Sequence, residues 1–275
     1  VLALSCQGQP SLAMVCACCC VETLGESAEV LQTPAGLHRQ EARGAQLLTN
    51  GTIYTGEWVG DQRHGCGELM WPDGALYKGQ WAEDTAHGEG RFEHGDGNVY
   101  EGQWLGDRAH GRGVYRHADG SEYIGDWAMD KQHGVGVETW PDGARFEGQY
   151  VNGYKNGQGK FSWIDGSSYE GTFEKNDLSG EGSYKWSDGR TYEGSWQANK
   201  LHGRGRFDWP DGRVYEGQYV NDVKDGHGVL TWPSGQQYDG EWKGGKQHGN
   251  GTYTTNAQSR KGVWVEGKRS RWISE

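Results

Sequence analysis

At 275 residues the chain has the length of one or two globular domains, yet it contains 48 glycines and only 33% hydrophobic residues, beside 14 tryptophans and 14 tyrosines. This composition argues against a thick aliphatic core and favours a thin structure with an aromatic face and glycine-rich turns. The net charge of −11 divides into −2 over residues 1–53, −12 over 54–259 and +3 over 260–275, so the main part lacks the basic face that nucleic acids and anionic membranes require.

Residues 1–43 are predicted to be a disordered leader and linker with an apolar, cysteine-rich run at 12–21. A signal peptide would need a basic segment before this run, and none of residues 1–11 is charged. A thiolate metal site would need wider spacing than adjacent cysteines offer. If translation starts at Met14, the cysteines become near-terminal acylation candidates; a leader without a role is the remaining interpretation. The acylation candidates are Cys16, Cys18, Cys19 and Cys20.

The other two cysteines, Cys6 and Cys66, have no evident partner in the sequence. This favours a reducing compartment over a disulfide framework, and hence a cytoplasmic protein. Two Asn-Gly-Thr sequons, at Asn50 and Asn250, are interpreted as turn dipeptides for the same reason.

From residue 54 onward the sequence repeats every 23 residues without insertion, which is typical of a repeat architecture. Residues 44–53 match the second half of a repeat and are predicted to be one strand that caps the array. Residues 260–266 are predicted to be a degenerate last strand, and 267–275 a basic tail. The nine repeats start at Tyr54, Tyr77, Tyr100, Tyr123, Phe146, Tyr169, Tyr192, Tyr215 and Tyr238.

Each repeat is predicted to form two antiparallel strands. Numbered from the tyrosine, positions 1, 3 and 5 are aromatic, glycine and aromatic, while positions 2 and 4 are polar and are expected to face water. Glycine at 14, an apolar residue at 16 and often tryptophan at 18 continue the alternation; Glu138 departs from it at 16. A Trp-Pro-Asp-Gly turn links the repeats. About twenty strands 4.8 Å apart would extend on the order of 90 Å as a twisted, curled open sheet.

The aromatic face is the predicted binding site. No other segment is predicted to cover it, so its rings are expected to line an exposed groove that binds protein partners or a second copy of the chain. The predicted partner-binding residues at positions 1 and 5 are Tyr54, Trp58, Tyr77, Trp81, Tyr100, Trp104, Tyr123, Trp127, Phe146, Tyr150, Tyr169, Phe173, Tyr192, Trp196, Tyr215, Tyr219, Tyr238 and Trp242.

Histidine recurs at position 11 and could suggest a metal site. Equivalent residues of adjacent repeats would lie about 10 Å apart, whereas two ligands of one zinc ion lie within about 4 Å of each other. These histidines are instead predicted to hold carbonyls at a hairpin turn. The Asp-Gly pairs are explained by turns, and no phosphate-binding loop occurs. We therefore predict no catalytic residue, no metal and no cofactor. The histidines are His64, His87, His110, His133, His202 and His248.

The nine-fold string YxGxWxxxxxHGxGxxxxxDGxx resembles the MORN (membrane occupation and recognition nexus) repeat family over residues 44–266. The resemblance implies an all-β, elongated, single-layer antiparallel meander of β-hairpin repeats, often dimeric. It also implies scaffold roles beside membranes, cytoskeleton and cilia. Repeats five, six and eight depart from the family's His-Gly step, with Asn156, Ser179 and Asp225 in place of histidine.

The sequence thus predicts a non-enzymatic scaffold or adaptor at a membrane–cytoskeleton or ciliary structure. One alternative is a targeting or regulatory module of a larger enzyme, of the lipid kinase or SET methyltransferase type found in some relatives, whose catalytic domain is absent here. Another is a phosphoinositide-binding module, which the acidity of the repeats disfavours. Membrane contact is expected to need the cysteines of the leader, helped by the basic residues between Arg260 and Arg271.

Overall fold

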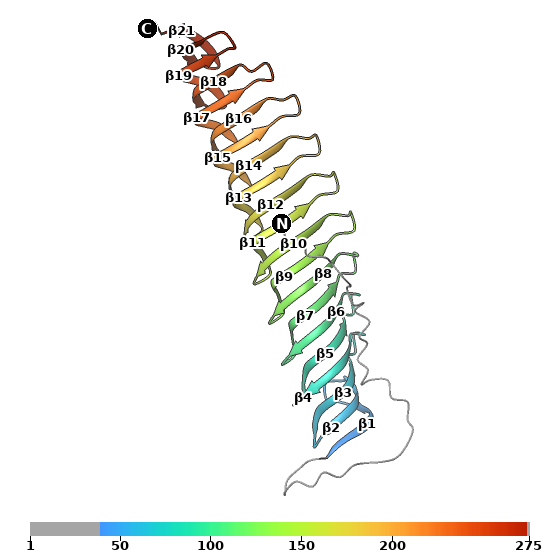
Figure 1. Cartoon of the computed structure of the whole chain (residues 1–275). Helices are drawn as coiled ribbons and strands as arrows, with labels where there is room; N and C mark the ends of the chain where they lie inside the picture. The colour runs from blue at the N-terminus through green and yellow to red at the C-terminus, as the bar shows by residue number, and fades with distance from the viewer. Residues whose placement is uncertain (1–38, 274–275) are drawn as a thin grey trace, which may run out of the picture. The chain divides into compact units, whose positions relative to one another are not determined.

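The computed structural model, shown in Figure 1, describes residues 39–273. These residues form 21 strands and no helix, and no membrane-spanning helix is found among them. Within each of the two compact units described below, consecutive strands pair antiparallel as successive hairpins, so the predicted all-β antiparallel meander is confirmed. The four acylation candidates, Cys16 to Cys20, lie outside the described residues.

The first of two compact units ends at Ala118. Its strands follow one another in space in chain order, from the first to the last. They are β1 (Gln40–Leu47), β2 (Ile53–Val59), β3 (Gln62–Met70), β4 (Leu76–Ala82), β5 (Thr85–Glu93), β6 (Val99–Leu105) and β7 (Arg108–Arg116).

The second unit begins at Asp119 and has the same organisation. Its strands are β8 (Glu122–Ala128), β9 (Lys131–Thr139), β10 (Arg145–Val151), β11 (Tyr154–Ser162), β12 (Ser168–Glu174), β13 (Asp177–Lys185), β14 (Thr191–Gln197), β15 (Lys200–Asp208), β16 (Val214–Val220), β17 (Val223–Thr231), β18 (Gln237–Lys243), β19 (Lys246–Thr254), β20 (Ser259–Val265) and β21 (Lys268–Trp272).

The two ends of the repeat array differ in detail from the prediction. The capping strand β1 starts at Gln40, before the predicted half-repeat at 44–53. The residues predicted to form a basic tail include a further strand, β21, which pairs with β20 through Val265 and Lys268. The basic residues of this region therefore belong to a terminal hairpin.

A two-residue turn at positions 7 and 8 closes each hairpin and was not predicted from the sequence. Glu83 and Asp84 occupy it with φ of 51° and 67°, the double positive φ of a type I′ turn. The turn also binds the preceding hairpin. The Asp84 carboxylate accepts a hydrogen bond from the Arg63 backbone N–H (2.9 Å), and the Asp84 N–H donates to the Arg63 carbonyl (3.1 Å). Asp107, Asn176, Asn199 and Asp222 repeat this link.

A bulge interrupts the second strand of each hairpin at position 12. In repeat five the register shifts between Gly148 and Tyr150, and Gly157 has a φ of 99°. The bulge leaves the N–H of Gln158 without a strand partner, and the Gln149 side chain accepts a hydrogen bond from it (2.8 Å). Position 4 was expected only to face water. It instead satisfies a backbone donor.

The core forms where a tyrosine ring lies over two glycines. Gly194 and Gly205 face each other across β14 and β15, and a Cβ on Gly205 would lie 2.3 Å from the Tyr192 hydroxyl oxygen. That hydroxyl donates to the Ser195 carbonyl (2.9 Å). Trp196 packs edge-on against Tyr192 (5.2 Å between centroids) and donates its indole N–H to the carbonyl of Gly182 in the preceding hairpin (3.2 Å). Trp81, Trp104 and Trp242 connect their repeats to the preceding ones in the same way.

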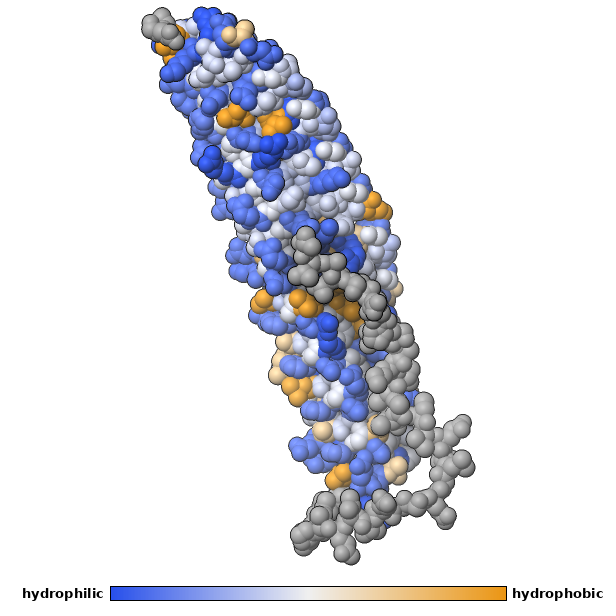
Figure 2. Space-filling model, viewed as in Figure 1, coloured by the Kyte–Doolittle hydropathy of each residue, from blue (hydrophilic) through white to orange (hydrophobic). Residues whose placement is uncertain are grey.

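The opposite face of the sheet is polar. Positions 15 and 2 of successive repeats are direct cross-strand partners and carry opposite charges in several repeats, including Glu68 with Lys78 (2.6 Å) and Lys160 with Glu170 (3.5 Å). Such pairs stabilise a sheet by up to about 1 kcal/mol each. Figure 2 shows that hydrophobic residues form only separate patches on the visible face.

The glycine at position 3 is predicted to tolerate no side chain. A Cβ on Gly148 would lie 2.6 Å from the Gly159 Cα and 2.7 Å from the Phe146 ring. Gly148→Val should therefore lower the unfolding free energy by more than about 2 kcal/mol in urea titrations. The control Glu147→Val changes an exposed residue of the polar face and should stay within about 0.5 kcal/mol. Equal losses in both variants would show that the faces are assigned wrongly.

The tyrosine hydroxyl should contribute separately from its ring. Tyr192→Phe removes the hydrogen bond to Ser195 and keeps the ring, so we expect a loss of about 1 kcal/mol in unfolding free energy. Tyr154, which is 50% exposed, provides the matched control, and Tyr154→Phe should change the stability little. The explanation fails if the two substitutions have the same effect.

Candidate functional site

The eighteen rings predicted to bind partners lie mostly in the core. Sixteen are buried, and only Trp104 and Trp127 are partly exposed. Burial also raises the pKa of the Tyr169 phenol to about 12. The expected exposed groove at positions 1 and 5 is therefore wrong. The rings need no second layer, because the edge-to-face contacts between rings of adjacent repeats cover them.

A second row of rings, at positions 16 and 18, remains partly exposed in the second unit. Consecutive ring centroids are 4.4 to 5.3 Å apart, and consecutive ring planes differ by 26° to 39°. The rings come from β11, β13 and β15 and from the turns that follow β9 and these strands. Only Phe207 among them is buried. We call this row the rim ladder: Trp140, Phe161, Trp163, Tyr184, Trp186, Phe207 and Trp209.

The corresponding row of the first unit has a different composition. Trp71 contacts Phe92, and Phe92 contacts His94, with centroid distances of 5.4 and 4.4 Å. Tyr115 contacts His117 at 4.6 Å. Histidine thus replaces tryptophan at position 18 in two repeats, which makes this row more polar than the rim ladder.

The side chains of the rim ladder offer unused hydrogen-bond donors. Core tryptophans such as Trp81 and Trp242 donate their indole N–H groups to glycine carbonyls, at 3.2 and 3.0 Å. Within residues 39–273, neither the indole N–H groups of Trp163 and Trp186 nor the Tyr184 hydroxyl donates a hydrogen bond to protein. These donors are available to a ligand.

An exposed isoleucine follows Trp163, the third ring of the ladder. Four of the equivalent turns carry proline after the tryptophan, whereas this turn carries Ile164, with 71% of its surface exposed. The proline ring lies beside the glycine of the preceding turn, since a Cβ built on Gly189 would lie 3.4 Å from Pro210 Cγ, whereas a Cβ built on Gly143 would have no atom of Ile164 within 4 Å. Trp163 and Ile164 together form an exposed apolar part of the rim.

A partly buried ion pair replaces an aromatic residue at one end of the ladder. Glu138 accepts hydrogen bonds from the Lys155 ammonium group (2.6 Å) and the Tyr150 hydroxyl (3.0 Å). The ammonium nitrogen lies 5.0 Å from the ring centroids of both Trp140 and Phe146. The departure of Glu138 (β9) from the repeat pattern is therefore compensated by a cation on β11, in the next hairpin.

A second lysine lies among rings at the other end of the ladder. The Lys224 nitrogen is 4.6 Å from the centroids of both Trp209 and Tyr215 and 5.1 Å from that of Trp242. Burial, together with the nearby Arg213 charge, lowers the pKa of Lys224 to about 8. In the part of the chain that the structure describes, Lys224 forms no ion pair, so the rings supply its local stabilisation.

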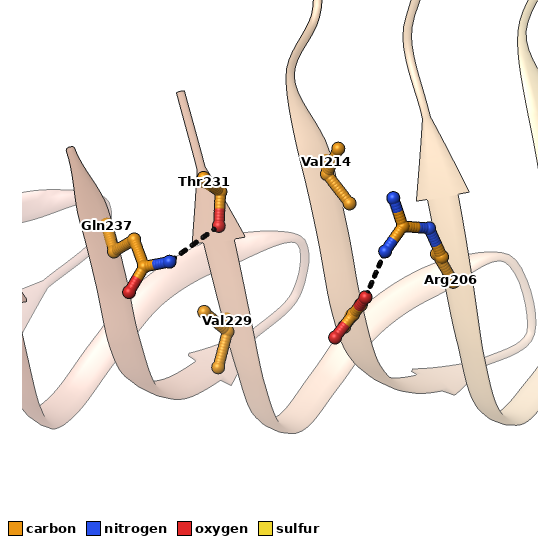
Figure 3. Close-up of a pocket in the computed structure, with 6 residues that line it drawn as sticks. Arg206, Val214, Val229, Thr231 and Gln237 are labelled. Atoms are coloured by element: carbon orange, nitrogen blue, oxygen red, sulfur yellow. Dashed lines mark hydrogen bonds and ion pairs between the residues drawn. The ribbon is translucent and has the colours of Figure 1, made fainter. Parts of the chain in front are cut away.

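The histidine row lies within strands, which corrects its predicted place at a turn. His64, for example, belongs to β3, and the turn precedes it. The Nδ1 atoms of His110, His133, His202 and His248 are buried without a hydrogen-bond partner. No group of three metal-ligating side chains is found among the described residues. A hollow on the polar face, shown in Figure 3, is lined by Arg206, which pairs with Glu216, and by Gln237, which donates to Thr231 (3.2 Å).

A family model described as "MORN repeat" matches the chain at residues 54–76, 77–99, 100–122, 123–145, 146–168, 169–189, 192–212, 215–237 and 238–259. No curated protein matches the chain.

Two solved structures show a limited likeness. The TCP10 domain of Danio rerio CPAP has 14% identity and a TM-score of 0.40, with 72% of this chain and 93% of that chain covered. The SAS-4 (dCPAP) TCP domain of Drosophila melanogaster, solved with a proline-rich motif of Ana2 (dSTIL), has 12% identity and a TM-score of 0.32, with 79% and 99% covered. Similarities of this size assign no activity or partner to this chain.

The partly buried ion pair of Glu138 and Lys155 predicts strong coupling between its two residues. Lys155→Leu leaves the Glu138 carboxylate without its cation, and Glu138→Tyr leaves the ammonium group without its anion. We expect each single variant to lose about 2 kcal/mol or more of unfolding free energy. The double variant restores the residue types of the other repeats and should lose less than either one. Additive losses in the double-mutant cycle would contradict the coupling.

The lysine among the rings predicts a pH dependence of stability. In the unfolded chain the lysine pKa is about 10.4, so the folded state binds this proton more weakly. The unfolding free energy should therefore rise as the pH increases from 7 through 8 towards 9.5. Lys224→Met should be more stable than the wild type by about 1 kcal/mol at pH 7, and this advantage should shrink by pH 9.5. A constant difference across these pH values would refute the assignment.

Proposed function

The chain belongs to the MORN repeat family, and from this premise we propose that it is a non-enzymatic scaffold or adaptor that binds protein partners through the rim ladder. Because the chain belongs to this family, it is a repeat module of a kind that binds proteins or associates with membranes. The rim ladder is the observation that carries the finer proposal, because it is a continuous row of rings that the fold leaves partly exposed.

The chemistry of the rim ladder suits a protein partner. Tryptophan and tyrosine dominate the binding energy of protein interfaces, since they combine a large apolar area with a hydrogen-bond donor. Trp163, Tyr184 and Trp186 offer both, and Ile164 adds an exposed aliphatic side chain beside them. The core rings cannot serve in this way, because binding would have to open the contacts between repeats.

The polar side chains make the same contacts in successive repeats, and this supports a scaffold role without catalysis. The turn aspartates accept hydrogen bonds from backbone N–H groups two residues later, as Asp142 does from Ala144 (2.9 Å). The charged residues of the polar face pair with each other across the strands. These groups are engaged in the same way in repeat after repeat, whereas acid–base catalysis needs groups that converge once in a cleft.

We propose a cytoplasmic location at a membrane, the cytoskeleton or a cilium, with membrane contact through the leader cysteines and the terminal basic hairpin. The hairpin of β20 and β21 exposes Arg260, Lys261, Lys268, Arg269 and Arg271. Each basic residue contributes about 1 kcal/mol near an anionic surface, so this group is marginal alone and requires a second signal such as acylation.

The proposal is tested by a pair of variants that preserve the fold. Ile164→Pro introduces the residue that the equivalent turns carry, and Lys185→Ala changes an exposed residue between Tyr184 and Trp186 in sequence. In quantitative affinity purification, partners of the wild-type chain should fall at least fivefold with Ile164→Pro and stay unchanged with Lys185→Ala. Partners that are retained equally by both variants would show that binding occurs elsewhere. A change in molar mass by light scattering would identify a second copy as the partner.

A further inference from the structure

We propose that the partner of the rim ladder is a proline-rich segment in the polyproline II conformation, with basic side chains at every third residue. This inference rests on the proposed function of the rim as a protein-binding surface, and it specifies the chemistry of the partner. Three features of the rim lead to it: its spacing, its unpaired donors and its row of carboxylates.

The spacing of the rim matches a three-residue repeat. Equivalent rings recur every second strand, which is about 9.6 Å for strands about 4.8 Å apart. A polyproline II helix has three residues per turn and rises about 3.1 Å per residue, so equivalent residues recur every 9.3 Å or so. A segment that runs along the ladder would therefore place one residue of the same kind over each repeat, with a mismatch of only about 0.3 Å per repeat.

Other regular conformations fit this spacing less well. A β-strand presents one face at every second residue, about 6.6 Å, or every fourth, about 13 Å. An α-helix returns to the same face after seven residues, about 10.5 Å, which accumulates a mismatch of about 1 Å per repeat. Addition of a strand is also excluded at the rim, because the backbone groups of β11, β13 and β15 are paired with strands on both sides.

The unpaired hydrogen-bond donors of the rim complement the free carbonyl groups of a polyproline II segment. Such a segment has no internal hydrogen bonds, so its carbonyl groups point outwards and need donors. The indole N–H groups of Trp163 and Trp186 and the hydroxyl of Tyr184 have no acceptor among the described residues. Aromatic grooves that carry such donors are the general recognition mode for proline-rich segments.

A row of carboxylates accompanies the rings at the same spacing. Asp142, Asp165, Asp188 and Asp211 each lie two residues after a ladder tryptophan, and all four are exposed. Asp188 and Asp211 pair with Arg190 and Arg213, at 2.7 and 2.8 Å, whereas Asp142 and Asp165 form no ion pair within the described residues. A basic residue at every third position of the partner would meet these carboxylates in turn.

The test measures fluorescence anisotropy of labelled synthetic peptides with the full chain at 150 mM salt. The probe is a fifteen-residue peptide of five Pro-Pro-Lys units. Five Ala-Ala-Lys units keep the charge and change the conformation, and five Pro-Pro-Glu units keep the conformation and reverse the charge. We expect the Pro-Pro-Lys peptide to bind at least tenfold more tightly than both others, and a Kd above 100 μM for it would overturn the inference.

Variants distinguish failure of this inference from failure of the proposed function. Trp163→Ser should weaken binding of the Pro-Pro-Lys peptide at least tenfold, and Lys185→Ala should leave it unchanged. Ile164→Pro, which preserves the turn, should weaken it too and covers the case in which Trp163→Ser does not fold. If the Ala-Ala-Lys peptide binds as tightly and loses affinity in the rim variants, the rim binds proteins but not polyproline II. If the Pro-Pro-Lys peptide does not bind while Ile164→Pro still depletes partners in affinity purification, only this inference fails; if neither effect is seen, both proposals fail.

Discussion

The contact between one tyrosine ring and two glycines determines this structure. In repeat seven, the ring of Tyr192 lies over Gly194 and Gly205, where a single Cβ would collide with it. Its hydroxyl holds the carbonyl of Ser195 beside the bulge of the next strand. The glycines, the bulge and the ring are therefore one unit, and none can change alone. Repetition of this unit, rather than a large apolar core, holds the chain in its fold.

This arrangement divides the aromatic residues into two groups with different roles. Trp196 is buried between tyrosines of adjacent repeats, and its indole N–H bonds to Gly182. Trp186 stands only ten residues earlier, but its ring lies at the partly exposed rim and its N–H has no protein acceptor among the described residues. Rings that join repeats are unavailable to a partner, whereas rim rings can bind one without loosening the sheet. The rings that are available to a partner and the rings that stabilise the fold are therefore different residues on the same face.

The alternation of residues predicted the strands and placed the glycines on the aromatic face, because a period of two is typical of a strand with two different faces. The Trp-Pro-Asp-Gly pattern predicted the turns between repeats. It did not predict which aromatic rings would be exposed. Alternation assigns Trp196 and Trp186 to the same face, and only the contacts of neighbouring repeats decide that the first is covered. The turn at Glu83 and Asp84 was missed because position 7 carries residues without a preference for positive φ, such as Glu83, Met129 and Lys175. Position 8, which is Asp, Asn or Gly in every repeat, was the signal that marks it. The partner of Glu138 lies seventeen residues away in sequence, on another strand.

The separation of the rings into core and rim can be measured directly by ¹⁹F NMR on protein labelled with 5-fluorotryptophan and exposed to a soluble gadolinium chelate. Individual Trp→Phe variants would assign the resonances. The structure predicts strong paramagnetic broadening for Trp163 and Trp186 and weak broadening for Trp81, Trp196 and Trp242. Comparable broadening of both groups would contradict it, because the rings at position 5 would then be open to solvent and could not be the core that joins the repeats.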